Sequence, residues 1–307
     1  MDFSEILMKM LLLMLTVGVG YGANKKGAMN KEFSSKLSKF LLDVTVPAVL
    51  LSAGMSGDIS FTPVEVLKLF GIAVLLFAVM GAIAYVVPLV IGAKADEAGT
   101  YRVLSAFSNT IFMGYPVVTA FFGASAVIYP AIYAIPFNVA LFSFGPMMLG
   151  SGKKEKFNWK QCLNSGTVCS LLALVLILLP FEMPKLVKDL CSSLGSATSP
   201  LALMIIGSNL ADMPLGEIFG EKRMYFFALF RLIVPPVVTY FLLGLIIADE
   251  VALGCAVIIA GLPSASMATL LSAKYGGHEE LASRGVMMTT LLSAVTIPAV
   301  MMLLFMR

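Results

Sequence analysis

Ten long apolar stretches, separated by short polar breaks, constrain the fold of this chain more than any other feature. A run of about 18 or more apolar residues is long enough to cross the hydrocarbon core of a bilayer as a helix. The stretches lie at 5–22, 38–56, 64–91, 101–122, 126–149, 161–180, 186–210, 223–247, 251–273 and 279–305. Charged residues make up only 13% of the chain, against about 25% in soluble domains. The pattern predicts an all-α membrane protein with ten transmembrane helices.

Cysteine, histidine and charge argue against several other classes of protein. The four cysteines are scattered without CxxC or Cys/His spacing, which favours neither a disulfide framework nor a metal site. HExxH and GxSxG are absent and His278 falls in a polar break, where we expect it to be solvated, so we predict no enzyme and no cofactor. A net charge of +3 is too small to indicate nucleic acid. The first stretch lacks a basic segment before it and is interpreted as a span, not a signal peptide.

The basic residues are divided unevenly between the two sets of breaks. Fifteen of the 21 lie beside odd-numbered breaks, five lie on the other face, and Arg231 falls inside the eighth stretch. The fifteen are Lys25, Lys26, Lys31, Lys36, Lys39, Lys94, Arg102, Lys153, Lys154, Lys156, Lys160, Lys222, Arg223, Lys274 and Arg284. Because cytoplasmic loops carry the excess of Lys and Arg, both termini are predicted to lie outside a plasma membrane.

Two pairs of segments repeat in the same order. VTVPAVLLSAG (44–54) is similar to ATSPLALMIIG (197–207), with proline and glycine offset by 153 positions. MGYP (113–116) is similar to AGLP (260–263), offset by 147 positions. Ordered matches at similar offsets indicate an internal repeat.

The repeat divides the chain into halves of five stretches each. Residues 1–150 form the first half, 151–160 are a cytoplasmic linker, and 161–307 form the second half. Five is an odd number, so the second half must enter the membrane upside down relative to the first. Inverted repeats of this kind are typical of secondary transporters.

A Gly-x-Pro interrupts the fourth stretch, and another interrupts the ninth. Proline removes a backbone donor, and in a membrane the freed groups have no water to bind. We expect Gly114–Pro116 and Gly261–Pro263 to break two helices that cross near mid-membrane, each half-helix starting at its proline. Two helix N-termini at the crossing would bind an anion without a basic side chain. The alternative for a single Gly-x-Pro is a packing kink.

Several polar side chains near these breaks are candidate substrate contacts. An amide such as that of Asn109 can donate to a carboxylate, or it can simply bond between helices. Ser264 is preferred over Ser266 and Thr269 because it adjoins Pro263, although serines often bond to their own helix. The predicted substrate-binding residues are Asn109, Gly114, Tyr115, Pro116, Tyr133, Asn138, Gly261, Pro263 and Ser264.

Asp43 and Arg231 are charged residues inside apolar stretches, where a charge costs about 2.5–3.5 kcal/mol on translocon scales. Asp43 is either a capping residue near a helix end or a protonatable coupling group. Arg231 is expected to pair with Asp43 or with a helix C-terminus. The sequence offers no acidic pair of the kind expected for cation antiport.

Four stretches also resemble a known family. NTIFMGYPVVTAFFG (109–123), GLPSASMATLLSAKYGG (261–277), FLLDVTVPAVLLSAG (40–54) and RGVMMTTLLSAVTIPAVMMLL (284–304) are similar to helices four, nine, two and ten of the auxin efflux carrier family. That family contains the plant PIN carriers and their bacterial relatives. The resemblance covers essentially the whole chain, whose short break SGKKEKFNWK is typical of bacterial members.

The resemblance implies a sodium/proton-antiporter-like fold in the bacterial inner membrane. It implies a scaffold of helices 1, 2, 6 and 7, a transport domain of helices 3–5 and 8–10, and crossing helices 4 and 9. It also implies elevator-type movement, a homodimer through the scaffold, and organic acids such as auxin or malonate as substrates. Asn109, Pro116 and Pro263 match family positions, whereas Asn164-Ser165 replaces an Asn-Pro and Ser264 replaces a glutamine.

Two transporter hypotheses therefore follow from the sequence. The first is a permease for small organic anions, with the lipid bilayer and a second copy as its other partners. The alternative is a sodium- or proton-coupled symporter or antiporter of the same architecture. Buried acids near the crossing would favour the alternative, and the sequence supplies almost none.

Overall fold

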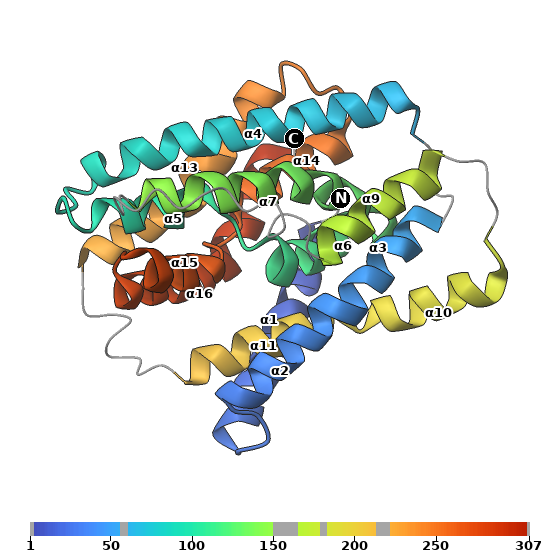
Figure 1. The fold of residues 1–307 in the computed structure, drawn as a ribbon, viewed down its shortest axis with the longest axis horizontal. Coiled ribbons are helices and arrows are strands. Elements are labelled where there is room, and N and C mark those ends of the chain that lie inside the picture. Colours follow the sequence, from blue (N-terminus) through green and yellow to red (C-terminus); the bar gives the residue numbers. More distant parts are fainter. Residues whose placement is uncertain (1–2, 56–60, 150–164, 179–182, 213–221, 306–307) are drawn as a thin grey trace. The chain divides into compact units, whose positions relative to one another are not determined.

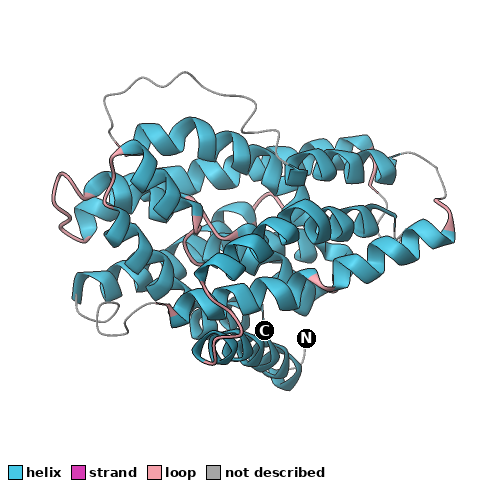
Figure 2. Ribbon diagram, turned by 60° about the horizontal axis from the view of Figure 1, so that its bottom comes forward, coloured by secondary structure: helices cyan, strands magenta, loops and turns pink. Residues whose placement is uncertain are grey.

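The chain is helical in every part that the computed structural model describes, which comprises residues 3–55, 61–149, 165–178, 183–212 and 222–305. These ranges contain no strand (Figure 2). Their extended pairing is a single antiparallel bridge between Ser108 and Ser264. The prediction of an all-α chain is confirmed for these residues. The predicted linker 151–160 and Asn164 lie outside them.

Helices occupy all ten apolar stretches (Figure 1). The first half contains α1 (Phe3–Lys25), α2 (Lys31–Phe40), the π-helical turn η1 (Leu41–Thr45), α3 (Val46–Met55), α4 (Pro63–Val90), α5 (Ala98–Ala106), the π-helical turn η2 (Thr110–Gly114), α6 (Tyr115–Phe122), the 3₁₀ turn η3 (Ala124–Val127) and α7 (Ile128–Met148). The second half contains α9 (Ser165–Leu178), α10 (Lys185–Ser196), α11 (Thr198–Ala211), α13 (Lys222–Leu243), α14 (Glu250–Gly261), α15 (Met267–Tyr275) and α16 (Glu279–Phe305).

Six of the described helical segments are long and apolar enough to cross a membrane. They are Lys31–Met55, Pro63–Val90, Ala124–Met148, Lys185–Ala211, Lys222–Leu243 and Glu279–Phe305. The shorter apolar helices Thr110–Phe122, Thr167–Leu178 and Glu250–Gly261 fall in the fourth, sixth and ninth stretches. The fourth and ninth stretches are therefore built from shorter helical pieces.

The second helix begins earlier than its apolar pattern predicts, at Lys31 instead of residue 38. Asn30 caps its N-terminus, since the Asn30 side chain accepts a hydrogen bond of 2.8 Å from the Phe33 main-chain N–H. Lys36 and Glu32 form an ion pair one turn apart on the exposed face. Local capping thus extends a helix into polar sequence that hydropathy alone leaves out.

The helices group into two compact units, described separately below. Unit 1 comprises residues 1–71, 111–135 and 163–213, and unit 2 comprises 72–110, 136–162 and 214–307. The chain passes between them inside the third, fourth and fifth stretches. Unit 1 thus holds the first, second, sixth and seventh stretches, and unit 2 holds the eighth, ninth and tenth.

Unit 1 is organised around α1 and α11, which pack together more extensively than any other described pair. Glycines allow this approach, because a Cβ built on Gly207 would overlap the carbonyl oxygen of Val17 and lie 2.7 Å from the Tyr21 nitrogen. The Asn24 side chain adds hydrogen bonds of 3.0 Å to Ser208 Oγ and 2.9 Å to Asp212 Oδ1. Backbones in contact and polar side chains between helices are typical of membrane helix packing.

Replacing Gly207 with alanine is expected to destabilise unit 1, because the new methyl group would clash with main-chain atoms of α1, which cannot move aside as a flexible side chain could. Overpacking of this kind typically costs about 1–3 kcal/mol. Thermal unfolding in detergent should show a lower melting temperature for Gly207→Ala. Gly22→Ala is the matched control, since a Cβ there meets nothing within 4 Å. An equal effect of both substitutions would argue against a backbone contact.

Unit 2 is built around α13, which packs against α14 and α16, while α15 packs against α16 and α5. Gly261 closes one of these contacts, because a Cβ there would lie 3.3 Å from Pro236 on α13. Gly285 similarly faces Leu104 at the end of α5. This packing gathers the ends of α5, α14 and α15 into one region of unit 2.

Candidate functional site

The fourth stretch is interrupted at Phe107–Asn109. Helix α5 ends at Ala106, and Phe107 takes an extended conformation with φ −115° and ψ 124°. The chain becomes helical again at Thr110. Serine and asparagine offer the backbone local hydrogen bonds that compete with a helix, so Ser108-Asn109 is a plausible local cause of the break.

The ninth stretch is interrupted at Leu262–Ala265. Helix α14 ends at Gly261, and Leu262 is extended with φ −63° and ψ 154°. This conformation is the one that proline imposes on the residue before it. Helix α15 begins at Met267 with Ser266 at its N-cap position.

The two interruptions pair with each other inside unit 2. The main-chain N–H of Asn109 donates to the Pro263 carbonyl at 2.9 Å, and that of Ala265 donates to the Phe107 carbonyl at 2.9 Å. Ser108 and Ser264 face each other in the resulting antiparallel bridge. Backbone freed from the helices is therefore satisfied by protein, as it must be at membrane depth.

The prediction that each half-helix starts at its proline is correct for Pro116 and wrong for Pro263. Helix α6 begins at Tyr115 with Gly114 at its N-cap position and Pro116 in its first turn, although the π-helical turn η2 leads into it from Thr110 and the break itself lies earlier. Helix α15 starts at Met267 instead of Pro263. The π-helical turn η2 immediately precedes Pro116, and a widened turn can accommodate the missing donor. The turn η1 stands in the same place before Pro47.

Arg231 of α13 donates to three oxygens at these interruptions. Its Nη1 donates to the Ala260 carbonyl at 2.7 Å and its Nη2 to Ser108 Oγ at 2.7 Å. Its Nε donates to the Leu104 carbonyl at 3.3 Å. The side chain is fully buried.

The acceptors of Arg231 include carbonyls in the last turns of α5 and α14. The last four carbonyls of a helix lack intrahelical partners and carry the negative end of its dipole. The expectation that Arg231 binds a helix C-terminus is therefore correct. Pairing with Asp43 is wrong: within the described ranges Arg231 forms no ion pair, and Asp43 is exposed in η1 of unit 1.

Ser264 and Gly261, both predicted to bind substrate, make contacts within unit 2. Ser264 Oγ donates to the Leu104 carbonyl at 2.7 Å, and the Ser264 main-chain N–H donates to Thr289 Oγ1 at 3.1 Å. Gly261 makes room for Pro236, as described above. Ser264 thus links the second interruption to α5 and α16, and Gly261 allows α14 to approach α13.

Asn109 and Tyr115 of the fourth stretch are nearly buried residues, 5% and 2% exposed, whose side-chain polar groups form no hydrogen bond with any described residue. Arg102 Nε in the same stretch is also buried without a partner there. Buried polar groups in native proteins normally have a partner. The side chains of Asn109 and Tyr115 therefore each have hydrogen-bonding capacity that the described residues leave unused.

The other predicted residues have varied surroundings. Pro116 and Tyr133 are buried in unit 1, whereas Asn138 is buried in unit 2. Tyr133 and Asn138 both lie on α7 and have interaction partners. Within unit 2 the structure brings together Asn109, Pro263, Ser264 and Arg231.

A sequence profile described as "Membrane transport protein" matches residues 5–157 and 151–301, which together span almost the whole chain. The chain belongs to this membrane transport family. The resemblance to the auxin efflux carriers and their bacterial relatives is thereby confirmed. Proteins of this family are transporters, which agrees with the expectation of a non-enzymatic function.

Relatives of this membrane transport protein match over nearly their full lengths. An uncharacterized transporter of Methanocaldococcus jannaschii is 24% identical over 294 residues, covering 94% of this chain and 95% of the relative. A "Putative malonate transporter" of Rhizobium meliloti is 27% identical over 285 residues, covering 87% and 86%. An uncharacterized transporter of Methanothermobacter thermautotrophicus is 22% identical over 301 residues, covering 97% of each.

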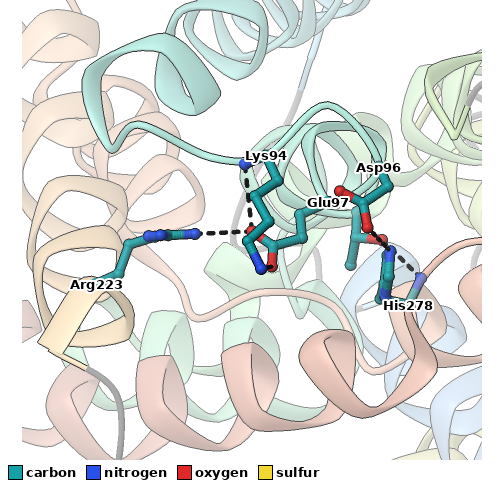
Figure 3. A network of polar contacts seen from close by, with 6 residues as sticks. Lys94, Asp96, Glu97, Arg223 and His278 are labelled. Carbon is teal, nitrogen blue, oxygen red and sulfur yellow. Dashed lines mark hydrogen bonds and ion pairs between the residues drawn. The ribbon is translucent and has the colours of Figure 1, made fainter.

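A separate polar network lies on other loops of unit 2 in the transporter (Figure 3). Glu97 accepts from Arg223 at 2.8 Å and lies 3.9 Å from Lys94. His278 lies 3.3 Å from Asp96, and its main-chain N–H donates to Thr100 Oγ1 at 3.0 Å. The His278 side chain is exposed, in agreement with the expectation that it is solvated, and it lies beside an exposed aspartate. The exposed pair of His278 and Asp96 contributes little stability.

Sequence reasoning missed Ser108 and Thr289, whose hydroxyls hold the interruptions. Ser108 stands beside Asn109 in an otherwise apolar run, and Thr289 begins a Thr-Thr pair in the tenth stretch. Either pair of polar residues could have drawn attention. Neither pattern identifies a partner from another stretch of the chain.

Proposed function

We propose that this protein is a permease that moves small organic anions, carboxylates in particular, across the plasma membrane. The observation that carries the proposal is the nearly buried Asn109 amide, which has no hydrogen-bond partner in the described residues. Its main chain is fixed against Pro263 while its side chain remains available. An amide NH₂ donates two hydrogen bonds, which suits a carboxylate oxygen.

The charge of the buried residues supports an anion as substrate. Within the described ranges, Arg231 is the one buried charged side chain, and no aspartate or glutamate is buried. Acidic residues near the interruptions would favour a cation as substrate, because a carboxylate offsets the cost of a cation's charge at mid-membrane. Here the fixed charge near the interruptions is positive.

The helix ends offer further donors. The helical segment Thr110–Phe122 begins directly after Asn109, and α15 begins directly after Ser266. The first turn of a helix carries the positive end of its dipole. The N–H groups of Thr110, Ala268 and Thr269 already donate to nearby carbonyls, so an anion here would be attracted by the dipole and by the remaining N–H groups. Interrupted membrane helices use such ends to bind anionic groups of substrates.

Malonate is the first substrate to test, because the name of the Rhizobium meliloti relative includes it. Because that relative is 27% identical to this chain, other mono- and dicarboxylates should be tested beside malonate. The shared feature is the carboxylate that Asn109 would bind.

For the mechanism we propose elevator-type alternating access. Unit 1, with the first, second, sixth and seventh stretches, would be the scaffold and the homodimer interface, and unit 2 the greater part of the moving domain. The fourth and fifth stretches, assigned whole to the transport domain from the resemblance, are divided between the units at 110/111 and 135/136. We retain the inverted repeat of residues 1–150 and 161–307, with both termini outside.

The decisive experiment is electrical. The protein is reconstituted into liposomes, and solid-supported-membrane currents are recorded on adding carboxylates, with and without a pH gradient. We expect carboxylate-evoked currents that protein-free liposomes lack and that Asn109→Ala greatly reduces. Currents driven by sodium or pH steps, with no response to any carboxylate, would replace this proposal with a cation-coupled transporter.

A further inference from the structure

The three acceptors of Arg231 have the chemistry of a small-cation site. Two are main-chain carbonyls from different interrupted helices, Leu104 of α5 and Ala260 of α14, and the third is the hydroxyl of Ser108. Ser264 Oγ lies 2.7 Å from the same Leu104 carbonyl and adds a further oxygen. Hard cations such as sodium are bound by carbonyl and hydroxyl oxygens of this kind.

In transporters with interrupted helices, the carbonyls at half-helix C-terminal ends are where coupling cations bind. Here the guanidinium of Arg231 donates hydrogen bonds to these carbonyls. Arg231 lies on a third helix, α13, and is fully buried. Arginine stays protonated in proteins, so its charge is permanent. No carboxylate in the described ranges forms an ion pair with it.

We propose that Arg231 is a tethered cation occupying a latent monovalent-cation site formed by Leu104, Ser108, Ala260 and Ser264. The guanidinium balances the negative ends of α5 and α14 as a bound sodium ion would. Substitution of Arg231 by a small neutral residue should expose the site to sodium from solution. The consequence of this inference for transport rests on the proposed anion-carrier function. The existence of the cation site does not depend on that function.

A purely structural arginine makes a different prediction. If Arg231 only filled space and satisfied hydrogen bonds, its removal would destabilise the protein equally in any salt. If it stands in for a cation, small cations should restore what the substitution removes. Ion-specific rescue therefore separates the two roles.

The test measures thermal unfolding of detergent-purified Arg231→Ala without any substrate. The variant is compared in chloride salts of N-methylglucamine, sodium and guanidinium, the last at millimolar, non-denaturing concentration. We expect a melting temperature several degrees below wild type in N-methylglucamine, substantially raised by sodium. Guanidinium restores the lost hydrogen bonds under either role and is the positive control, so rescue by guanidinium but not by sodium would overturn the proposal. Wild type and Arg223→Ala, which removes a guanidinium at the start of the same helix, should not respond.

Absence of any rescue in Arg231→Ala, or an equal response of wild type, would overturn the proposal. If Arg231→Ala does not fold, Arg231→Gln keeps most of the volume without the charge, and its failure to respond to sodium would also overturn it. Measuring the melting temperature requires no transport. If no carboxylate evoked a current, the proposed function would be refuted, but the test of the cation site would be unaffected. Where carboxylate currents are present, wild-type currents should be unchanged between sodium and N-methylglucamine.

Discussion

Asn109→Asp should abolish carboxylate transport while leaving the fold intact. Aspartate has nearly the shape of asparagine, but it replaces two donors with a negative charge. A hydrogen bond to a charged group contributes about 1.5–3 kcal/mol, so its loss alone lowers affinity by about 10- to 100-fold. Repulsion between two carboxylates adds to that loss. Carboxylate-evoked currents in proteoliposomes measure the effect directly.

Asn30→Asp is the matched control for this substitution. The chemical change is identical, but Asn30 is an exposed N-cap of α2, and aspartate caps a helix as well as asparagine does. We expect its transport and melting temperature to equal those of wild type. Unimpaired carboxylate currents in Asn109→Asp would refute the anion site. New currents evoked by sodium would instead support cation coupling and make Asp43 the next residue to substitute.

Thr289→Val should destabilise the paired interruptions. The hydroxyl of Thr289 accepts the main-chain N–H of Ser264 at 3.1 Å and donates to the Gly285 carbonyl at 2.7 Å. Valine has the same shape but leaves the Ser264 N–H buried without a partner. An unsatisfied buried donor costs about 1–3 kcal/mol. The melting temperature should fall, and transport should fall with it because Ser264 borders the break.

Thr290→Val tests whether position or chemistry produces this effect. Thr290 is also buried, but its hydroxyl donates only to the Val286 carbonyl of its own helix. Removing that bond leaves no orphaned donor, so we expect a much smaller shift in melting temperature. If the two valine variants behaved alike, the Thr289–Ser264 bond would not matter to stability.

The helices could be located from the sequence because their cause is local. An apolar run of sufficient length has one favourable backbone in a membrane, and all ten runs are helical where the structure describes them. The positions of the breaks were harder to predict. Proline at 116 seemed the obvious interruption, yet η2 accommodates it and the polar pair Ser108-Asn109 marks the break.

The contacts that build the site are long-range and left no local pattern. Arg231 reaches Leu104 across 127 positions of sequence, and Ser264 reaches it across 160. Hydropathy could identify Arg231 as costly and a helix end as one possible partner. It could not identify which carbonyls were near, because that depends on how α5, α13 and α14 pack. The sequence therefore predicted Arg231 as a notable residue without predicting its partners.

The bridge between Phe107–Asn109 and Pro263–Ala265 is made from main-chain atoms. Hydrogen bonds of this kind do not depend on which side chains the paired residues carry. A substitution at residue 109 therefore changes the side chain at the break but not the main-chain bonds that hold the paired interruptions together. Under the proposed function, an evolving lineage could exchange one substrate for another at this position while these bonds remained constant.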